Sequence, residues 1–414
     1  MAERLILVIM IDALGHRIVR ESGTFDFLEA PDGSLPSVCG YSSACIPSIF
    51  TGKLPVEHGH WAMYLRDPEH SVFRPFRPLI WLTSGILGRQ HFTRRLITRG
   101  VHHAGISGYF SLYEVPPHLL PQFDLCEKRD IFSPGAFPGL QTPFDAARAW
   151  RLRMRVWSWR TPEEQNRAEL SEAIRRGDHD MLFFYSPLLD GLMHAHGTRS
   201  DATRKCLEDF ASFTREMLAA AKGAYRETRL LVFGDHGMAD TVGTYDLLSK
   251  IEQLPLRVPQ DFLYFVDSTM ARFWFFERRA RDQVEALLST VKCGRVLEDA
   301  ECDRLGILFP DRRYGELVFL ADPGMLLVPS FMGKKPLAAM HGYHPEDGDS
   351  DTILLCNYSH AQIHSTRDIG PLLVSELAAM RGTAGETESP GSSAGEGSGA
   401  GEGSSAGERS GAGE

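Results

Sequence analysis

The sequence predicts an α/β fold with a mostly parallel central sheet, and three observations lead to this prediction. Three short apolar segments, at 5–11, 180–185 and 229–234, each end at polar residues, as strands buried on both faces do. A helix with apolar residues at helical spacing, 201–222, separates the last two segments. The order strand, helix, strand is typical of parallel strands joined by crossover helices.

The remaining elements follow in a less regular order. We expect three further strands and two further helices, at 271–276, 316–320 and 353–356 and at 280–291 and 369–380. Residues 62–175 are rich in Arg, Trp, Phe and Pro and fit the strand–helix alternation poorly. We therefore expect a catalytic domain formed by 1–61 and 176–382, with 62–175 inserted as a cap over the sheet.

The C-terminal segment, 383–414, consists of repeated Ala-Gly-Glu and Gly-Ser units without aromatic or large aliphatic residues. Such a composition cannot bury enough apolar surface to offset the entropy lost on ordering. We therefore expect this tail to be disordered and to take no part in the chemistry.

Composition limits the partners and the location. The 414 residues carry a formal net charge of −10, which argues against nucleic-acid polymers as ligands, because these need a basic face. Seven cysteines, an odd number without a CxxC pair, favour reduced thiols in the cytoplasm. No stretch approaches the ~20 apolar residues of a membrane span, and we expect no stable membrane association. The sequence leaves the oligomeric state open.

Candidate metal ligands follow the predicted strands. Asp12 ends the first strand, Asp190 follows the second and the Asp235-His236 pair follows the third. Because the carboxyl ends of parallel strands meet at one edge of a sheet, these side chains should converge. His194 lies four residues after Asp190, one helical turn away, so both can face one ion. A later His-Gly-Tyr-His loop adds His341 and His344.

These residues resemble the motifs of the alkaline phosphatase superfamily, nearest its type I phosphodiesterase/nucleotide pyrophosphatase branch. The segment from Ser42 to the Thr51-Gly52 pair resembles the nucleophile segment, in which the attacking residue stands nine places before Thr-Gly. The metal-ligand motifs also occur in the expected order, from Asp12 to His341. The resemblance implies a three-layer α/β/α sandwich and a metal-dependent hydrolase.

The resemblance also implies the site. One metal would be held by Asp190, His194 and His341, and a second by Asp12, Asp235, His236 and the Ser42 oxygen. Zinc suits carboxylate and imidazole ligands, and manganese or iron are the alternatives. Ser42 would be the nucleophile, at the start of a helix through 43–50, with Ser43 as the rival; a plain helix cap is the structural alternative for Ser42.

The residue types that follow Ser42 indicate which reaction to expect. Sulfatases have Pro and Arg where this chain has Ala44 and Ile46, and no Arg follows Ser42 as a clamp for a phosphomonoester dianion. We therefore expect cleavage of phosphodiester or pyrophosphate bonds in a small molecule. In the nucleotide pyrophosphatase branch, Asn usually stands at the position of Cys45, and thiols are poor donors. Cys45, His196, Arg272 and His344 are the candidate substrate contacts.

Three alternatives remain open from the sequence. An acceptor alcohol in place of water would make the protein a phosphotransferase, and a preference for monoesters would make it a phosphomonoesterase. A chain that had kept the fold for binding alone would be a non-enzyme. That last alternative predicts missing ligands, whereas all seven metal-site positions are filled.

Overall fold

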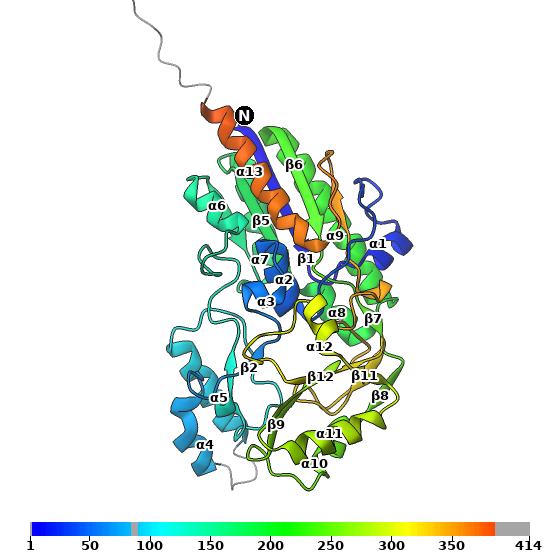
Figure 1. The fold of residues 1–414 in the computed structure, drawn as a ribbon. Helices are drawn as coiled ribbons and strands as arrows, with labels where there is room; N and C mark the ends of the chain where they lie inside the picture. Colours follow the sequence, from blue (N-terminus) through cyan, green and yellow to red (C-terminus); the bar gives the residue numbers. More distant parts are fainter. Residues whose placement is uncertain (1, 84–89, 386–414) are drawn as a thin grey trace, which may run out of the picture.

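The computed structural model describes residues 2–83 and 90–385, and its centre is a five-stranded sheet in the order β15-β6-β1-β5-β4 (Figure 1). Four neighbouring strands are parallel, and β15 pairs antiparallel with β6 at one edge. The strands are β1 (Ala2–Ile11), β4 (Met154–Trp157), β5 (Met181–Ser186), β6 (Tyr225–Phe233) and β15 (Leu354–Cys356).

Alternate residues of β1 pack into two different helix layers, because successive side chains of a strand point to opposite faces. Leu5, Leu7 and Ile9 share a core with helices on one face, whereas Ile6 and Val8 share a core with helices on the other. The first layer contains α7 (Glu163–Arg176), α8 (Leu188–His196) and α9 (Asp201–Ala224). The second contains α2 (Ser42–Thr51), α6 (Pro143–Ala149) and α13 (Ile369–Gly385). The expected three-layer α/β/α sandwich is confirmed.

A second, antiparallel sheet lies below the first in Figure 1, in the order β11-β12-β10-β9. Its strands are β9 (Phe262–Val266), β10 (Met270–Phe275), β11 (Gly294–Val296) and β12 (Leu317–Ala321), and its flanking helices are α10 (Leu247–Glu252), α11 (Arg278–Ser289) and α12 (Asp299–Arg304). One core joins this sheet to the antiparallel strand pair β2 (Tyr64–Arg66) and β3 (Phe123–Leu125) and to α4 (Arg77–Thr83) and α5 (Gln90–His103). The lower part is therefore built from two separate stretches of the chain.

The predicted bounds of the cap, 62–175, differ from the structure in two ways. Its last third carries β4, which pairs with β5 in the central sheet, together with α6 and α7 of the helix layers. Conversely, residues 262–321 were assigned to the catalytic domain but form the second sheet. β4 escaped prediction because it is an edge strand, half-exposed, in which Arg155 stacks over Trp157. That pattern does not read as a buried strand.

The shorter elements complete the described chain: α1 (His16–Ser22), α3 (Pro55–His58), and the strand pairs β7 (Ala239–Asp240) with β14 (Ala339–Met340) and β8 (Gly243–Tyr245) with β13 (Met325–Leu327). Helix α13 continues five residues past the predicted end at 380. Of the predicted tail, 386–414 lies outside the described residues. Among the described helices, none has the length and apolar character of a membrane span.

Candidate active site

Three neighbouring strands of the central sheet deliver the acidic residues to one edge. In the order β6-β1-β5, Asp235 follows β6, Asp12 follows β1 directly, and Asp190 lies on α8, the helix that follows β5. His341 arrives from the loop after β14. The expected convergence at the carboxyl ends of the strands is therefore present, between the two sheets seen in Figure 1.

One group of donor atoms consists of Asp12, Asp235 and His236, whose candidate ligand atoms lie within 4.8 Å of one another. His236 Nε2 is 3.3 Å from Asp235 Oδ2 and 3.5 Å from Asp12 Oδ1. All three side chains are buried. Ser42, the first residue of α2, joins this group, because its Oγ lies 3.1 Å from His236 Nε2.

The second group consists of Asp190, His194 and His341, again within 4.8 Å of one another. Asp190 Oδ1 lies 3.2 Å from His194 Nε2 and 3.6 Å from His341 Nε2. The two groups are adjacent, because the His236 and His341 rings stack with centroids 3.7 Å apart. The structure thus brings all seven predicted metal-site residues into one place.

The backbone after β1 is shaped by the site. Ala13 adopts a left-handed conformation with φ of 61°, which costs free energy for a residue with a side chain. In this conformation its N–H donates to Asp235 Oδ1 over 3.2 Å. The turn therefore fixes the position of Asp12, which precedes Ala13, relative to Asp235.

Buried carboxylates this close together repel one another electrostatically. Burial raises the pKa of Asp12 well above its ordinary value, and the charges of Asp235 and Asp190 raise it further. Burial also raises the pKa of Asp235, to about 6. Burial lowers the pKa of the His341 imidazole, and the neighbouring His236 and His194 act in the same direction. Without cations, the fold therefore disfavours the charged forms of these groups.

Hydrogen bonds orient the imidazoles. His194 Nδ1 is 2.9 Å from the carbonyl oxygen of Ala339, and His236 Nδ1 is 2.9 Å from that of Gly237. A ring whose Nδ1–H donates to a carbonyl presents Nε2 as an acceptor toward the site. Tyr185, near the end of β5, donates its hydroxyl to Asp12 Oδ2.

The two candidate nucleophiles differ in their surroundings. Ser42 Oγ faces His236, whereas Ser43 Oγ donates to the carbonyl oxygen of Trp61 over 3.3 Å. Helix α2 begins at Ser42, one residue before the predicted start, so the hydroxyl lies at the amino end of the helix. Of the two serines, Ser42 is the one that lies against the acidic and imidazole groups.

Comparison with known proteins adds the decisive observation. The profile of the family described as type I phosphodiesterase / nucleotide pyrophosphatase matches residues 28–344, about three quarters of the chain. The chain belongs to this family. It is accordingly an enzyme of the phosphoric ester hydrolase class and a phosphodiester hydrolase by family. Among curated proteins, no sequence matches it.

Solved structures share the fold of this phosphodiesterase at low sequence identity. Murine ectonucleotide pyrophosphatase / phosphodiesterase 5 superposes with a TM-score of 0.64 at 15% identity, covering 90% of this chain and 95% of that one. The human protein of the same name gives 0.64 at 14%, covering 90% and 94%. An inactive Thr-to-Ala variant of the murine protein, in complex with AMP, gives 0.63 at 16%, covering 91% and 95%.

The four predicted substrate contacts of this phosphodiesterase lie in less favourable positions. Cys45 is fully buried, with its thiol 3.8 Å from the carbonyl oxygens of Val38 and Gly40. Arg272 is also fully buried, and it donates to Asp267 Oδ2 over 3.0 Å and to a backbone carbonyl. Neither side chain is open to a substrate, because Cys45 is packed in the interior and Arg272 forms a buried ion pair with Asp267.

The two remaining histidines lie near the surface. His196 is exposed at the last position of α8. His344 Nε2 lies 3.2 Å from Glu301 Oε1 of α12, which links the His341 loop to the second sheet. His344 is therefore engaged by a carboxylate, and a substrate contact by His196 stays a prediction.

Sequence reasoning missed Tyr185, which touches a candidate ligand directly. The strand register aligns Met10 with Tyr185, so this ring lies beside the end of β1, where Asp12 follows. A tyrosine at the carboxyl end of a strand that neighbours an acidic strand end was the available signal. The carbonyl oxygens of Ala339 and Gly237, which accept from the imidazoles, had no sequence signal, because their positions depend on how the chain folds around them.

Proposed function

We propose that the protein is a two-metal phosphodiesterase that cleaves a small-molecule phosphodiester or pyrophosphate through a phosphorylated Ser42. The observation that carries the proposal is the position of Ser42 Oγ, 3.1 Å from His236 Nε2, next to two adjacent groups of acidic and imidazole donors. A hydroxyl nucleophile beside two such groups is what phosphoester cleavage by displacement needs.

The residues present fit two divalent cations. One carboxylate oxygen of each acidic residue, namely Asp12 Oδ1, Asp190 Oδ1 and Asp235 Oδ2, is buried without a hydrogen-bond partner among the described residues and faces an imidazole nitrogen. A buried, unpaired carboxylate oxygen is unfavourable unless a cation or a donor meets it. Mixed carboxylate and imidazole donors suit zinc, with manganese or iron as alternatives.

We assign Asp190, His194 and His341 to one cation, and Asp12, Asp235, His236 and Ser42 to the other. When bound, the cations would lower the pKa of a hydroxyl or a water molecule and neutralise charge that develops on the phosphoryl oxygens. Three carboxylates with neutral imidazoles carry a charge of −3, so the cations would also reverse the sign of the field toward an anionic substrate.

The chain itself supplies the nucleophile and its orientation. In the first step Ser42 loses its hydroxyl proton, its Oγ forms a bond to phosphorus, and the bond from phosphorus to the leaving oxygen breaks, so that the leaving oxygen can take up a proton from solvent. In the second step a water oxygen attacks phosphorus and gives up a proton, the bond to Ser42 Oγ breaks, and Oγ takes up a proton to regenerate the serine. The amino end of α2 favours negative charge at Ser42 throughout, because its first amides lack helical partners.

The substrate class we propose is a small nucleotide-like diester or pyrophosphate. In its favour, a solved relative of this fold, inactivated by loss of a threonine hydroxyl, was captured with AMP. The sequence around Ser42 also lacks an arginine clamp for a phosphomonoester dianion. The mildly acidic chain again argues against nucleic-acid polymers.

The cytoplasmic location remains part of the proposal. All seven cysteines are free thiols in the structure, as expected for a reducing compartment. Burial raises the pKa of Cys39 to about 12, which keeps this thiol protonated and unreactive. Fractionation of cells that express the chain, with thiol labelling, would test the location.

The test of the function is a matched pair of serine variants. With zinc-loaded protein, bis-p-nitrophenyl phosphate should be hydrolysed faster than p-nitrophenyl phosphate. Ser42→Ala should lower kcat by roughly a thousandfold or more, because the nucleophile is lost. Ser43→Ala should retain most activity, since its hydroxyl donates only to a backbone carbonyl. Mass spectrometry after an acid quench should find phosphate on Ser42.

Two results would reject this assignment. Loss of activity in Ser43→Ala with an active Ser42→Ala would move the nucleophile to the neighbouring serine. A higher kcat/KM for the monoester would replace the phosphodiesterase proposal with a phosphomonoesterase.

A further inference from the structure

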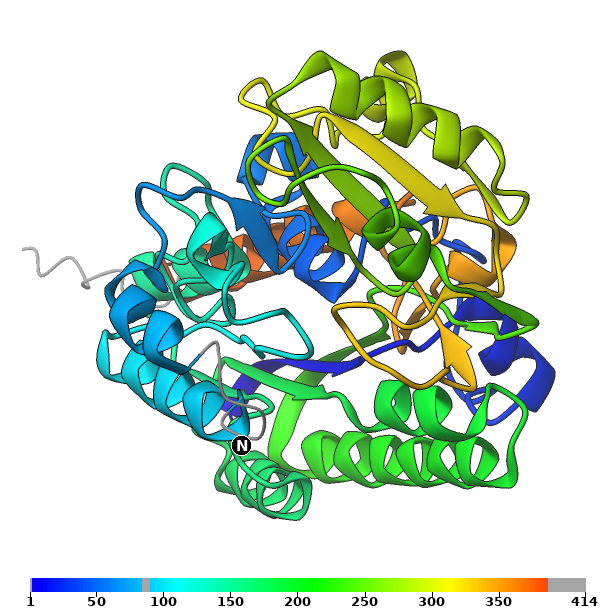
Figure 2. The same cartoon turned by 90° about the horizontal axis from the view of Figure 1, so that it is seen from below.

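Helices α4 and α5 carry an unusual charge for this chain. Between Glu69 and Glu114 the sequence contains six arginines and neither Asp nor Glu, although the whole chain has a formal net charge of −10. The two helices lie side by side at the periphery in both Figure 1 and Figure 2, and Figure 1 shows them away from the central sheet. Positive charge is therefore concentrated on one corner of the molecule.

Helix α5 has a buried side and an outward side. Ile97 and Val101 are fully buried in the core of the lower part. Residues at helical spacing on the opposite side point outward, with Phe92 59% and Leu96 38% exposed, followed by the exposed Arg99. The outward side is thus apolar in the first half of the helix and cationic in the second.

Helix α4 continues the same surface. Ile80 packs into the same core as Ile97 of α5, whereas Trp81 is 80% and Leu82 65% exposed, one turn after the exposed Arg77. Ten large hydrophobic residues are exposed in the described part of the chain, and four of them lie on these two short helices. Scattered exposed apolar residues need no explanation, but a cluster of them with arginines does.

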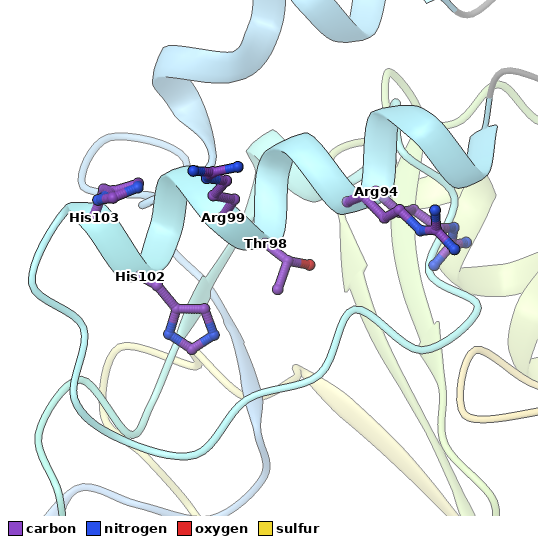
Figure 3. Close-up of a pocket in the computed structure, with 6 residues that line it drawn as sticks. Arg94, Thr98, Arg99, His102 and His103 are labelled. Carbon is purple, nitrogen blue, oxygen red and sulfur yellow. The ribbon is translucent and has the colours of Figure 1, made fainter.

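A hollow of about 500 Å³ lies along α5 beside this surface. Figure 3 shows that Arg94, Thr98 and His102 leave one ridge of the helix and that Arg99 and His103 leave the adjacent ridge. Arg94 donates to the backbone carbonyl oxygens of Leu112, Tyr113 and Val115. These hydrogen bonds hold its side chain in place at one side of the hollow. Among the described lining residues, Arg94 lies 4.0 Å from Glu114, and Arg95 and Arg99 provide the cationic groups that suit a phosphate.

We propose that α4 and α5 dock the protein onto the anionic surface of a phospholipid bilayer. Trp81, Leu82, Phe92 and Leu96 would enter the interfacial layer, while Arg77, Arg95 and Arg99 would contact lipid phosphates. Aromatic and aliphatic residues beside arginines on one helical surface are the pattern of interfacial helices. The bilayer is the occupant that matches both the charge and the apolar residues, whereas a free phosphate would use only the hollow.

The proposed docking is peripheral and reversible. None of the described helices could cross a bilayer, and four apolar side chains with three arginines give only a shallow anchor. The sequence alone led us to expect no stable membrane association, and reversible docking is compatible with that expectation. It does not depend on the proposed chemistry, because no residue of the candidate active site takes part in it.

Co-sedimentation of the full chain with vesicles tests the proposal. The protein should bind phosphatidylcholine vesicles containing about 30% phosphatidylserine and should not bind pure phosphatidylcholine. Raising the salt from about 0.05 M to about 0.5 M should release it, because exposed charges are screened. Arg95→Glu/Arg99→Glu and Trp81→Ala/Leu82→Ala should each weaken binding by about tenfold or more.

Arg175→Glu/Arg176→Glu is the matched control, since these exposed arginines end α7, which packs on the central sheet and not in the core that α4 and α5 share. The proposal is overturned if the wild type does not bind anionic vesicles at low salt, or if the α7 control loses binding to the same extent as the α5 variant. A wild-type dimer that Trp81→Ala/Leu82→Ala converts to a monomer, without vesicle binding, would also overturn it. Unchanged thermal unfolding in each variant excludes misfolding as the cause.

Discussion

The hydrogen bond from Tyr185 to Asp12 shows how a neighbouring side chain orients a candidate metal ligand. Its hydroxyl is buried against Asp12, whose other oxygen has no hydrogen-bond donor among the described residues. The donor therefore fixes one carboxylate oxygen and leaves Oδ1 directed toward His236. An acidic ligand held in this way loses less freedom when it binds a cation.

Tyr185→Phe should weaken metal binding while the protein remains folded. Loss of a hydrogen bond to a metal ligand typically costs about 10- to 100-fold in affinity. Competitive metal titration with a chromogenic chelator would measure the loss. Tyr225→Phe is the control, because Tyr225 lies at the start of β6 and its hydroxyl accepts from the His179 amide, outside the candidate site. Equal metal affinities in the two variants would contradict a role for Tyr185 at the site.

Arg272 leads to a prediction about stability rather than about substrate binding. Its guanidinium is fully buried against the buried Asp267, and burial raises the pKa of this carboxyl although Arg272 opposes the shift. Arg272→Ala would leave an uncompensated buried carboxylate and should lower the free energy of unfolding by about 3–5 kcal/mol. Urea denaturation would measure this change.

The control for Arg272 is Arg279→Ala, which removes an exposed arginine 3.9 Å from Asp261 and should cost at most about 1 kcal/mol. At temperatures where the Arg272→Ala protein is folded, its KM should equal that of the wild type. A stable Arg272→Ala protein with a raised KM would restore the substrate contact that the sequence suggested.

At the scale of elements, the sequence predicted what local pattern determines. The segments of β1, β5 and β6 were recognisable because both faces of each are buried, and α9 because one of its faces is. The second sheet was not assembled from its strands, because β12 pairs with β10 across the intervening α11, β11 and α12, and because β9 and β11 were not among the expected elements. Sequence distance of that kind leaves no periodic signal.

The site shows the same difference between features set by local sequence pattern and features set by contacts between distant segments. Ligand identity could be predicted, because residue types at the strand ends and the family resemblance both indicated it. Substrate contacts could not, since whether Cys45 or Arg272 is buried or exposed depends on packing with distant segments. Ala13 likewise gives no sign in the sequence of its left-handed conformation, which appears only once Asp235 is placed beside it.

The loop after β6 yields a prediction at this scale. An ideal Cβ on Gly237 would lie 2.0 Å from the carbonyl oxygen of Asp349 and 2.7 Å from that of Asp351, so backbone must move to admit it. Gly237→Ala should therefore displace the adjacent His236 and lower kcat/KM by about tenfold or more. Gly191→Ala on α8 is the control, because its Cβ would meet nothing within 4 Å. Equal activities would show that the loop tolerates the shift.

At the scale of the whole molecule, the site joins distant parts of the chain. Asp12 comes from the first strand, Asp190 and Asp235 from the middle, and His341 from a loop that Thr269 and Tyr41 tie to the second sheet. Ligands that come from separate segments make metal binding part of the folding free energy, because the unfolded chain cannot present them together. Cations at the site should therefore stabilise both the part built on the central sheet and the part built on the second sheet.

Removal of metal should then lower the thermal stability of the whole chain. A cation present at about 100 times its Kd stabilises the folded state by about 2.7 kcal/mol at each site. Chelation would also restore repulsion among the carboxylates of Asp12, Asp190 and Asp235, of which the first and last are buried and Asp190 is half-buried. Differential scanning calorimetry should show a lower Tm after dialysis against chelator, with recovery on adding zinc, manganese or iron according to the native metal. A His194→Ala/His341→Ala variant, which lacks two donors of one group, should lose part of this response. A wild-type Tm that is indifferent to chelator, in protein shown by elemental analysis to have carried metal, would mean that the cations lie elsewhere than between these strands.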